Sequence, residues 1–226
     1  MRRKAISFDL PQSSYLVSNP KVGVGMKKLF ALISAVVLVT APASAAVITE
    51  GFTFSVADAF VGPSGVGTHF HSSTGGDFGN PAGKAEVGEL GDEEVRGLSE
   101  YDLAGLAGGG PAFVTFRVDI LGGLFGQWAF DGVIEVLAYL GNNTENLSDF
   151  EAASTGLVGS FSTAGLVVGQ TLSFDISALL TAAITAGDPS LGIRLQKVGS
   201  TGGGAIVFDS FRLTTENLSD GVIPLP

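Results

Sequence analysis

The chain contains no cysteine among its 226 residues, and it has only one tryptophan and two histidines. Without cysteine there can be no disulfide and no thiol chemistry, so an apolar core has to hold the fold by itself. No phosphate-binding loop, dinucleotide fingerprint or nucleophile elbow occurs in the sequence. The common motifs of nucleotide-dependent and serine-hydrolase enzymes are therefore missing.

Basic residues are scarce, and half of them lie near the N-terminus. The first 45 residues hold six of the 12 lysines and arginines and one of the 22 acids, which leaves six bases and 21 acids in residues 46–226, a formal net charge of −15. Such a chain repels nucleic acid and anionic lipid, so neither is an expected partner. An acidic surface is compatible with the binding of cations or neutral glycans, or it serves only to keep an exported protein soluble.

Residues 26–45, MKKLFALISAVVLVTAPASA, have the pattern of a secretory signal peptide. Two lysines follow Met26, an apolar run extends from Leu29 to Val39, and the small triplet Ala43-Ser44-Ala45 closes the stretch. The apolar run is shorter than the roughly 20 residues of a membrane span. We expect export and cleavage between Ala45 and Ala46; a buried helix or an uncut anchor is the alternative.

The signal peptide sets the expected domain boundaries. Residues 1–25 precede it without any sustained period, and we interpret them as an extension from a start codon placed too early, with Met26 as the true start. Residues 46–214 are expected to form one domain and residues 215–226 a C-terminal tail. No apolar run of spanning length follows Ala45.

Alternating apolar residues predict an all-β domain. In the clearest example Val114, Phe116 and Val118 point one way while Thr115 and Arg117 point the other, as in an antiparallel sheet with one wet face. Similar segments, separated by turns rich in glycine, indicate roughly seven to nine strands. One short helix is expected at residues 178–186, capped by Ser177, and residues 62–83 read as a long surface loop. The predicted fold is an antiparallel β-sandwich of the jelly-roll type.

The C-terminal residues Ile223-Pro224-Leu225-Pro226, together with the signal peptide, resemble exported proteins that carry the PEP-CTERM sorting tail. In that family an apolar helix and an arginine cluster follow the motif; here the chain stops, which we interpret as a truncated tail. Residues 94–106 and 204–214 are similar to segments of jelly-roll modules in such proteins, which are similar to galactose-binding and carbohydrate-binding sandwiches. The resemblance implies export and sorting machinery as partners and a surface or extracellular location in bacteria that often make exopolysaccharide. It does not imply an enzyme.

The resemblance also suggests a structural calcium site. By strand alternation Asp209 shares a side with Val207 and Leu213, which would face the core, and a buried carboxylate needs a partner or a metal. In similar sandwiches an acid on the last strand helps to hold calcium beside the first strand, where Glu50 is the candidate partner. We therefore hypothesise that Glu50 and Asp209 bind Ca²⁺; the alternative is that Asp209 bonds to arginine or to backbone.

Trp128, the single tryptophan, lies in a glycine-rich turn. An exposed indole could stack on a sugar ring, whereas burial in the core is the more common fate of tryptophan. Trp128 is therefore the candidate glycan-binding residue, and a core position is the alternative.

His69 and His71 are the only histidines, and an H-x-H pattern in an extended segment puts both rings on one side. Zinc needs three or four ligands, and Asp77 is the only nearby acid in the sequence, so polar loop residues are expected and a transition-metal site is the alternative. The acidic run Asp92-Glu93-Glu94 reads as a solvated turn, because adjacent carboxylates on a strand point apart.

These observations favour an exported, non-catalytic β-sandwich at the cell surface or in the extracellular matrix, with polysaccharide as the expected ligand. One alternative is a secreted carbohydrate-active enzyme of the glycoside-hydrolase kind, in which two carboxylates would face each other across a concave pocket. A purely structural matrix protein is the other, and a closed surface without pockets would favour it.

Overall fold

The computed structural model describes residues 45–59, 66–72, 82–199 and 203–220. The predicted signal peptide up to Ser44, Asp77 and the C-terminal motif Ile223–Pro226 lie outside these ranges. Within them, no helix is both long and apolar enough to cross a membrane.

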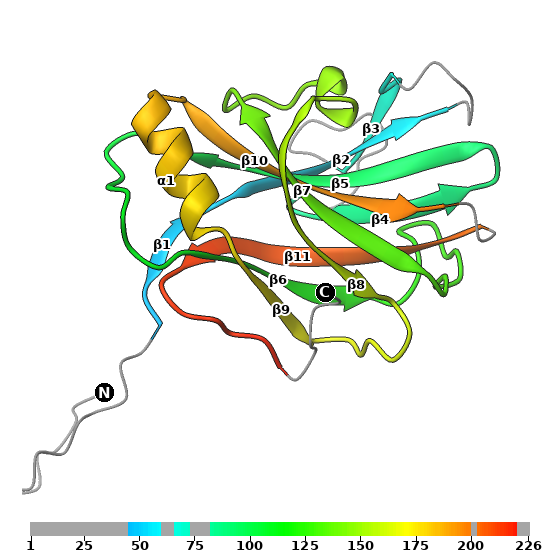
Figure 1. Cartoon of the computed structure of the whole chain (residues 1–226). Coiled ribbons are helices and arrows are strands. Elements are labelled where there is room, and N and C mark those ends of the chain that lie inside the picture. Colours follow the sequence, from blue (N-terminus) through cyan, green and yellow to red (C-terminus); the bar gives the residue numbers. More distant parts are fainter. Residues whose placement is uncertain (1–44, 60–65, 73–81, 200–202, 221–226) are drawn as a thin grey trace, which may run out of the picture. The chain divides into compact units, whose positions relative to one another are not determined.

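The described residues form eleven strands, one α-helix and one short 3₁₀ helix (Figure 1). The first strands are β1 (Val47–Glu50), β2 (Phe52–Asp58), β3 (His69–Ser72), β4 (Ala85–Leu90), β5 (Glu93–Asp102), β6 (Phe113–Ile120) and β7 (Val133–Gly141). The 3₁₀ helix η1 (Leu147–Phe150), β8 (Ser154–Ser162), β9 (Thr171–Asp175), α1 (Ser177–Ala186), β10 (Ser190–Val198) and β11 (Gly204–Thr214) follow.

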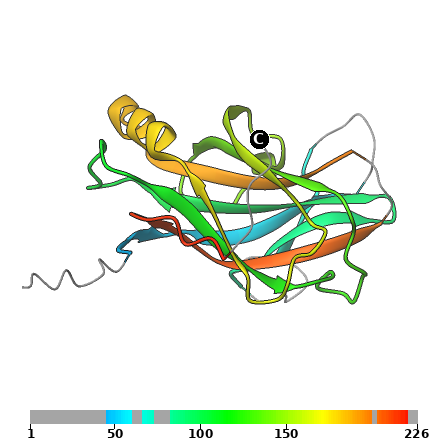
Figure 2. The same cartoon turned by 60° about the horizontal axis from the view of Figure 1, so that its bottom comes forward.

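All strand pairs are antiparallel and belong to one sheet in the order β8-β7-β10-β5-β4-β11-β6-β9. Three further strands branch from this path: β1 pairs with β11, β2 pairs with β5, and β3 pairs with β2. The sheet curls back on itself until it is nearly closed (Figure 1, Figure 2). The predicted all-β sandwich is confirmed.

The main core lies between the faces of this curled sheet and is rich in phenylalanine. Val114, Phe116 and Val118 are fully or almost fully buried in it, as the alternation predicted. The Phe116 ring stacks on Phe211 with centroids 4.9 Å apart and meets Phe208 edge-on at 5.5 Å. Buried aromatic rings of this kind supply much of the apolar burial that a chain without disulfides needs.

A second, smaller apolar cluster lies beside the first and fixes the edge strand β3. Phe70 of β3 meets the buried Phe54 of β2 edge-on, with ring centroids 6.4 Å apart. Since strand residues alternate sides, the apolar contact of Phe70 leaves His69 and His71 together on the opposite face of β3. The strand itself differs from the prediction, because its residues were expected to belong to a loop at 62–83.

The single α-helix agrees with the expected range of 178–186 to within one residue, and Gly187 ends it in the left-handed conformation with φ 77°. The expected capping role of Ser177 is wrong. Ile176 occupies the N-cap position, and the Asp175 carboxylate accepts a hydrogen bond from the Ser177 amide at 2.8 Å. The Ser177 hydroxyl instead accepts a hydrogen bond at 2.9 Å from the amide of Ala112, the residue that precedes β6.

Candidate functional site

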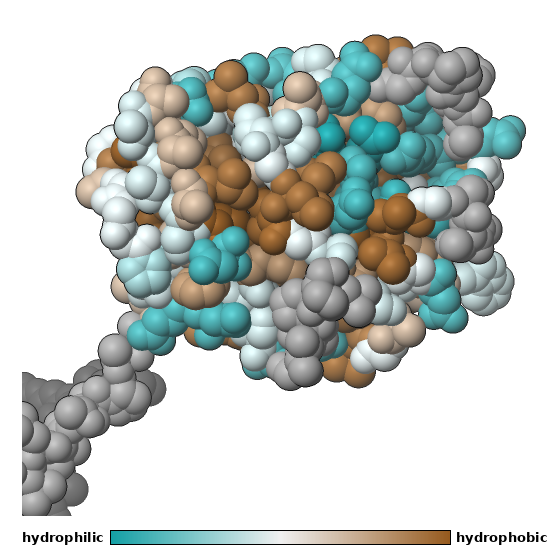
Figure 3. Space-filling view, viewed as in Figure 1, coloured by the Kyte–Doolittle hydropathy of each residue, from teal (hydrophilic) through white to brown (hydrophobic). Residues whose placement is uncertain are grey.

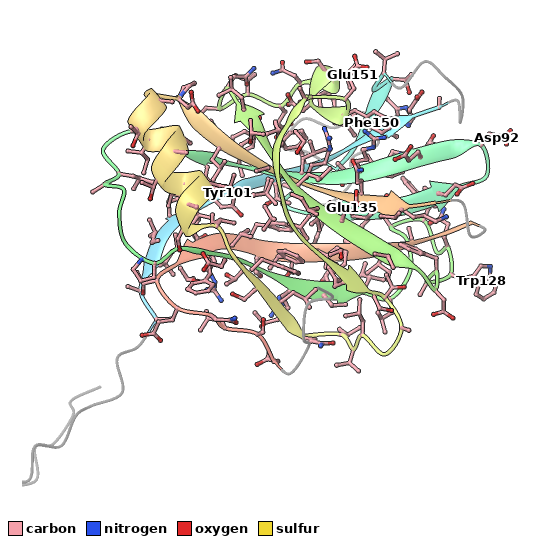
Figure 4. All side chains as sticks on the ribbon, in the orientation of Figure 1. Asp92, Tyr101, Trp128, Glu135, Phe150 and Glu151 are labelled. Carbon is pink, nitrogen blue, oxygen red and sulfur yellow. The ribbon has the colours of Figure 1, made fainter. Side chains whose placement is uncertain are left out.

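Trp128 is exposed over 83% of its surface, so the alternative of a core position is wrong. It lies in the loop between β6 and β7, and its side chain projects away from the sheet (Figure 4). The positive φ of Gly126, 82°, allows the tight turn before it. The indole is therefore offered to solvent instead of filling the core.

The backbone of Trp128 is held on two sides, although its side chain is exposed. It forms an isolated antiparallel bridge with Gly122, and its carbonyl accepts a hydrogen bond from the Ala205 amide of β11 at 2.9 Å. Within the turn, the Gln127 side-chain oxygen accepts a hydrogen bond from the Phe125 amide at 3.2 Å. These bonds fix the base of the indole, so a ligand would lose little backbone entropy on binding there.

A shallow depression of about 480 Å³ lies beside Trp128, lined by Glu89, Leu90, Gly91, Gln127, Gly203 and Gly204. Glu89 brings a carboxylate to it, and Lys197 donates a hydrogen bond to that carboxylate at 2.8 Å. Polar groups that can accept or donate hydrogen bonds therefore surround one flat aromatic surface. A sugar, with hydroxyls at its edge and an apolar ring face, needs this combination.

Asp209 contacts cations of the protein. Arg117 donates two hydrogen bonds of 3.1 Å to its carboxylate, Lys84 donates one of 3.0 Å, and the Ser210 hydroxyl donates one of 2.9 Å. Burial alone would raise the pKa of Asp209, but the hydrogen bonds from Arg117, Lys84 and Ser210 outweigh it and lower the pKa to about 2. These contacts agree with the alternative to calcium binding, in which Asp209 bonds to an arginine of the protein.

The side on which Asp209 lies also differs from the expectation. Phe208 and Phe211 both face the main core, which strict alternation forbids, because the β6–β11 register shifts between Asp209 and Arg212 and Ser210 has φ 56°. Asp209 lies on the side opposite its neighbour Phe208, and the bulge after it turns Phe211 and Leu213 to the side of Phe208, so Asp209 does not share a side with Leu213. Glu50 lies on β1 in register with Arg212. The two cations beside Asp209 disfavour a further divalent ion, and calcium at Glu50 and Asp209 stays a prediction.

The structure brings the two histidines together with acids that the sequence analysis placed elsewhere. Ligand atoms of His69, His71 and Glu93 all lie within 4.8 Å of one another. Glu86, which no sequence argument singled out, is fully buried and contacts His71. The signal that could have found both acids is the tight turn at Gly91-Asp92, which joins β4 to β5 as a hairpin.

Two other depressions flank α1. One of about 420 Å³ has two carboxylate residues, Asp102 and Asp188, among those that line it. The other, of about 190 Å³, lies between α1 and the end of β7 and includes Leu140 and Leu179. Figure 3 shows apolar side chains gathered beside α1 on this face. Neither contains an exposed aromatic residue like Trp128.

Comparison of the chain with models of protein families and with curated proteins finds no match.

Proposed function

We propose that this protein is an exported, non-catalytic β-sandwich that binds polysaccharide at the cell surface or in the extracellular matrix, with Trp128 as the central contact. The observation that carries the proposal is the exposure of Trp128 on a backbone that is hydrogen-bonded on two sides. A single large aromatic side chain that is kept in water has to be stabilised by the rest of the fold, since its burial would be favourable.

The chemistry of the depression fits a sugar better than an apolar ligand. The indole can cover the C–H face of a pyranose, and the carboxylate of Glu89, which lines the same depression, can accept hydrogen bonds from its hydroxyls. One such contact supports weak binding per site, which suits a protein that meets a polymer with many equivalent sugars.

Charge favours a neutral glycan over an acidic one. Residues 46–226 have a formal net charge of −15, and the acid Glu89 is the only charged residue among those that line the depression. The nearby cation, Lys197, is already bound to Glu89. A uronic-acid or sulfated polymer would therefore be repelled, in particular at low salt.

The proposal that the protein is exported rests on its sequence. The stretch from Met26 to Ala45 has the three parts of a signal peptide, and the strands begin directly after it, at Val47. The resemblance of Ile223–Pro226 to the PEP-CTERM motif supports the same location and a sorting step after export. Mass spectrometry of protein expressed with its leader tests the first point: a mature chain that begins at Ala46 is expected, and retention of residues 26–45 would contradict it.

Affinity electrophoresis tests glycan binding. The protein, Trp128→Ala and the control Leu157→Ala are run through gels that contain barley β-glucan, xylan or alginate, with calcium and with chelator. Leu157 is the matched control because it is 63% exposed and belongs to β8, outside the depression. We expect retardation in at least one neutral gel, its loss in Trp128→Ala, and full retention in Leu157→Ala.

The other outcomes decide between the alternatives. Equal mobility of all three proteins in every gel would overturn the proposal and favour a structural matrix protein. New reducing ends after incubation with a polysaccharide would identify a carbohydrate-active enzyme. Their loss in Asp102→Asn or Asp188→Asn would place its site at the depression beside α1.

A further inference from the structure

We propose that His69, His71 and Glu93 form a zinc site, with Glu86 as the residue that positions His71. In the structure the Nε2 atom of His71 lies 2.5 Å from one oxygen of Glu93, and the Nε2 atom of His69 lies 3.4 Å from the other. The two imidazole rings are 5.0 Å apart between centroids. Both Nε2 atoms therefore face the same carboxylate.

The backbone explains why these three side chains converge. His69 and His71 are two residues apart on β3, so both point to one face of it. Strand β2 pairs with β3 on one side, where Ala57 lies opposite His69, and with β5 on the other side, where Asp58 lies opposite Glu94. Glu93, the first residue of β5, is thereby placed beside the histidines. The cluster thus rests on strands of a sheet, which position ligands more precisely than loops do.

The hydrogen bonds of Thr68 favour Nε2 of His69 as the nitrogen that binds a metal. Thr68 has one hydroxyl proton, and its oxygen lies 3.1 Å from the Ala57 carbonyl, to which it donates. The same oxygen accepts from the Ala59 amide at 2.9 Å and lies 3.0 Å from Nδ1 of His69. Since the proton of Thr68 is used, Nδ1 of His69 is the donor in the last contact. The Nε2 atom, which faces Glu93, then carries the lone pair that a metal needs.

Glu86 contacts Nδ1 of His71 and so leaves Nε2 of His71 as its metal-binding nitrogen. Its side chain has no exposed surface, and one oxygen lies 2.8 Å from Nδ1 of His71. Its other oxygen accepts a hydrogen bond from the Leu124 amide at 2.8 Å, which fixes its orientation. A carboxylate that accepts from Nδ1 of a ligating histidine is the usual outer-shell partner at zinc sites, where it holds the ring and raises its basicity. A buried carboxylate of this kind is costly without such a role.

The ligand types select the metal. Two imidazole nitrogens and one carboxylate make the His₂Glu set of zinc enzymes, whereas calcium and magnesium prefer oxygen ligands alone. Ligands at zinc distance, roughly 2.0–2.1 Å, lie about 3.3 Å apart in a tetrahedral site. The 3.4 Å between Nε2 of His69 and Glu93 matches this separation, whereas the 2.5 Å between Nε2 of His71 and Glu93 is a hydrogen-bond length, so this pair has to move apart when zinc binds. His71 is buried with Phe125 edge-on to its ring at 5.5 Å, while His69 and Glu93 are half-buried and give access from solvent. Three protein ligands leave a fourth position for water or a ligand oxygen.

The competing account of the same contacts is a charged His71 that bridges Glu86 and Glu93 without metal. Zinc titration of the chelator-stripped protein, made without a polyhistidine tag, separates the two accounts. Calorimetry gives the affinity, elemental analysis after gel filtration gives the zinc per chain, and Co²⁺ in place of zinc reports coordination through its visible absorption bands. We expect one zinc per chain and cobalt bands in the wild-type protein.

Four variants identify the ligands. Stoichiometric binding and the cobalt bands should be lost in His69→Ala and Glu93→Gln, and Glu86→Gln should weaken zinc binding by about 10- to 100-fold. The matched control is Glu94→Gln, because Glu94 is the neighbour of Glu93 but pairs with Arg96 at 2.7 Å; it should bind zinc like the wild type. Circular dichroism confirms that each variant is folded.

Two results overturn the proposal. The first is a wild-type protein that holds no stoichiometric zinc, which decides the question even if a variant fails to fold. The second is equal affinity in the wild type, His69→Ala and Glu93→Gln, which would mean that zinc binds elsewhere. In either case the ion-paired His71 is the correct account of the cluster.

Discussion

Arg117 and Asp209 lie directly opposite each other on β6 and β11, and the arginine donates two hydrogen bonds of 3.1 Å to the carboxylate. The pair lies next to the β-bulge of β11, where Ser210 and Lys84 each donate a further hydrogen bond to the same carboxylate. An ion pair at this point compensates for a ladder that is locally broken. It ties the last strand to its neighbour across the irregularity.

Asp209→Asn should lower the free energy of unfolding by about 1–2 kcal/mol at neutral pH, since hydrogen bonds to a charged group are lost. The pKa of Asp209 is lowered to about 2 in the fold, from an ordinary 3.8. Its contribution is therefore complete above pH 4 and disappears as the pH falls toward 2. Urea unfolding across this range should show a difference between wild type and variant that shrinks on acidification. A difference that stays constant down to pH 2 would contradict this.

Glu100 is fully buried and accepts four hydrogen bonds, so its replacement should be costly. Its donors are the Tyr139 hydroxyl at 3.1 Å, the Ser190 hydroxyl at 3.1 Å, and the amides of Asn142 and Asn143 at 2.9 and 2.7 Å. Glu100→Ala orphans all of them and should destabilise by about 3 kcal/mol or more. Glu100→Gln keeps one acceptor oxygen for the two amides and should cost about 1 kcal/mol. Chemical denaturation gives both values, and equal losses would exclude this explanation.

Asp149 should make the protein less stable as the pH rises from about 4 to 6. Burial raises the pKa of Asp149 from 3.8 to about 6, although the Asn146 amide, which donates to its carboxylate, opposes the shift. The folded state therefore binds the proton more tightly than the unfolded state, and this stabilisation is lost through that interval. Asp149→Asn mimics the protonated form, so its stability relative to wild type should increase between pH 4 and 6 and stay level above. A constant difference in thermal unfolding over this range would refute the assignment.

Gly192→Ala should destabilise the sheet by about 1–3 kcal/mol, because the new methyl group would overlap the ring of Tyr139. The two residues face each other across β10 and β7, and the ring lies over the space that the glycine leaves. Gly110→Ala is the matched control, since nothing lies within 4 Å of its added carbon. Melting temperatures should separate the two variants clearly. If the melting temperatures of the two variants shift equally, the close contact between Gly192 and Tyr139 does not contribute to stability.

The strands were predictable where one face is apolar and the ladder is regular, as around Phe116. The prediction was wrong at Asp209, because a bulge changes the phase of alternation without leaving a signature in residue types. It was also wrong about the strand at His69–Ser72, which is short and depends on pairing with β2. Short edge strands are set by tertiary contacts more than by their own sequence.

The candidate sites were less accessible to sequence reasoning. The backbone of Trp128 is held by a hydrogen bond from the Ala205 amide, which is 77 residues further along the chain. The acids at the histidine cluster, Glu86 and Glu93, reach it through the β4–β5 hairpin and the pairing of β2 with β5. The sequence pattern therefore identified the two histidines of the cluster, whereas its two acids could be identified only from the order and pairing of the strands.

The position of β11 determines when this domain can fold. It is the last strand in the chain, yet it pairs with β4 and β1 on one side and with β6 on the other. Until Thr214 is available, those three strands lack a common partner and the phenylalanine core lacks Phe208 and Phe211. Such non-local pairing slows folding, because the entropy of closing long loops is lost before the contacts form. The complete core therefore requires a chain that has been synthesised as far as Thr214.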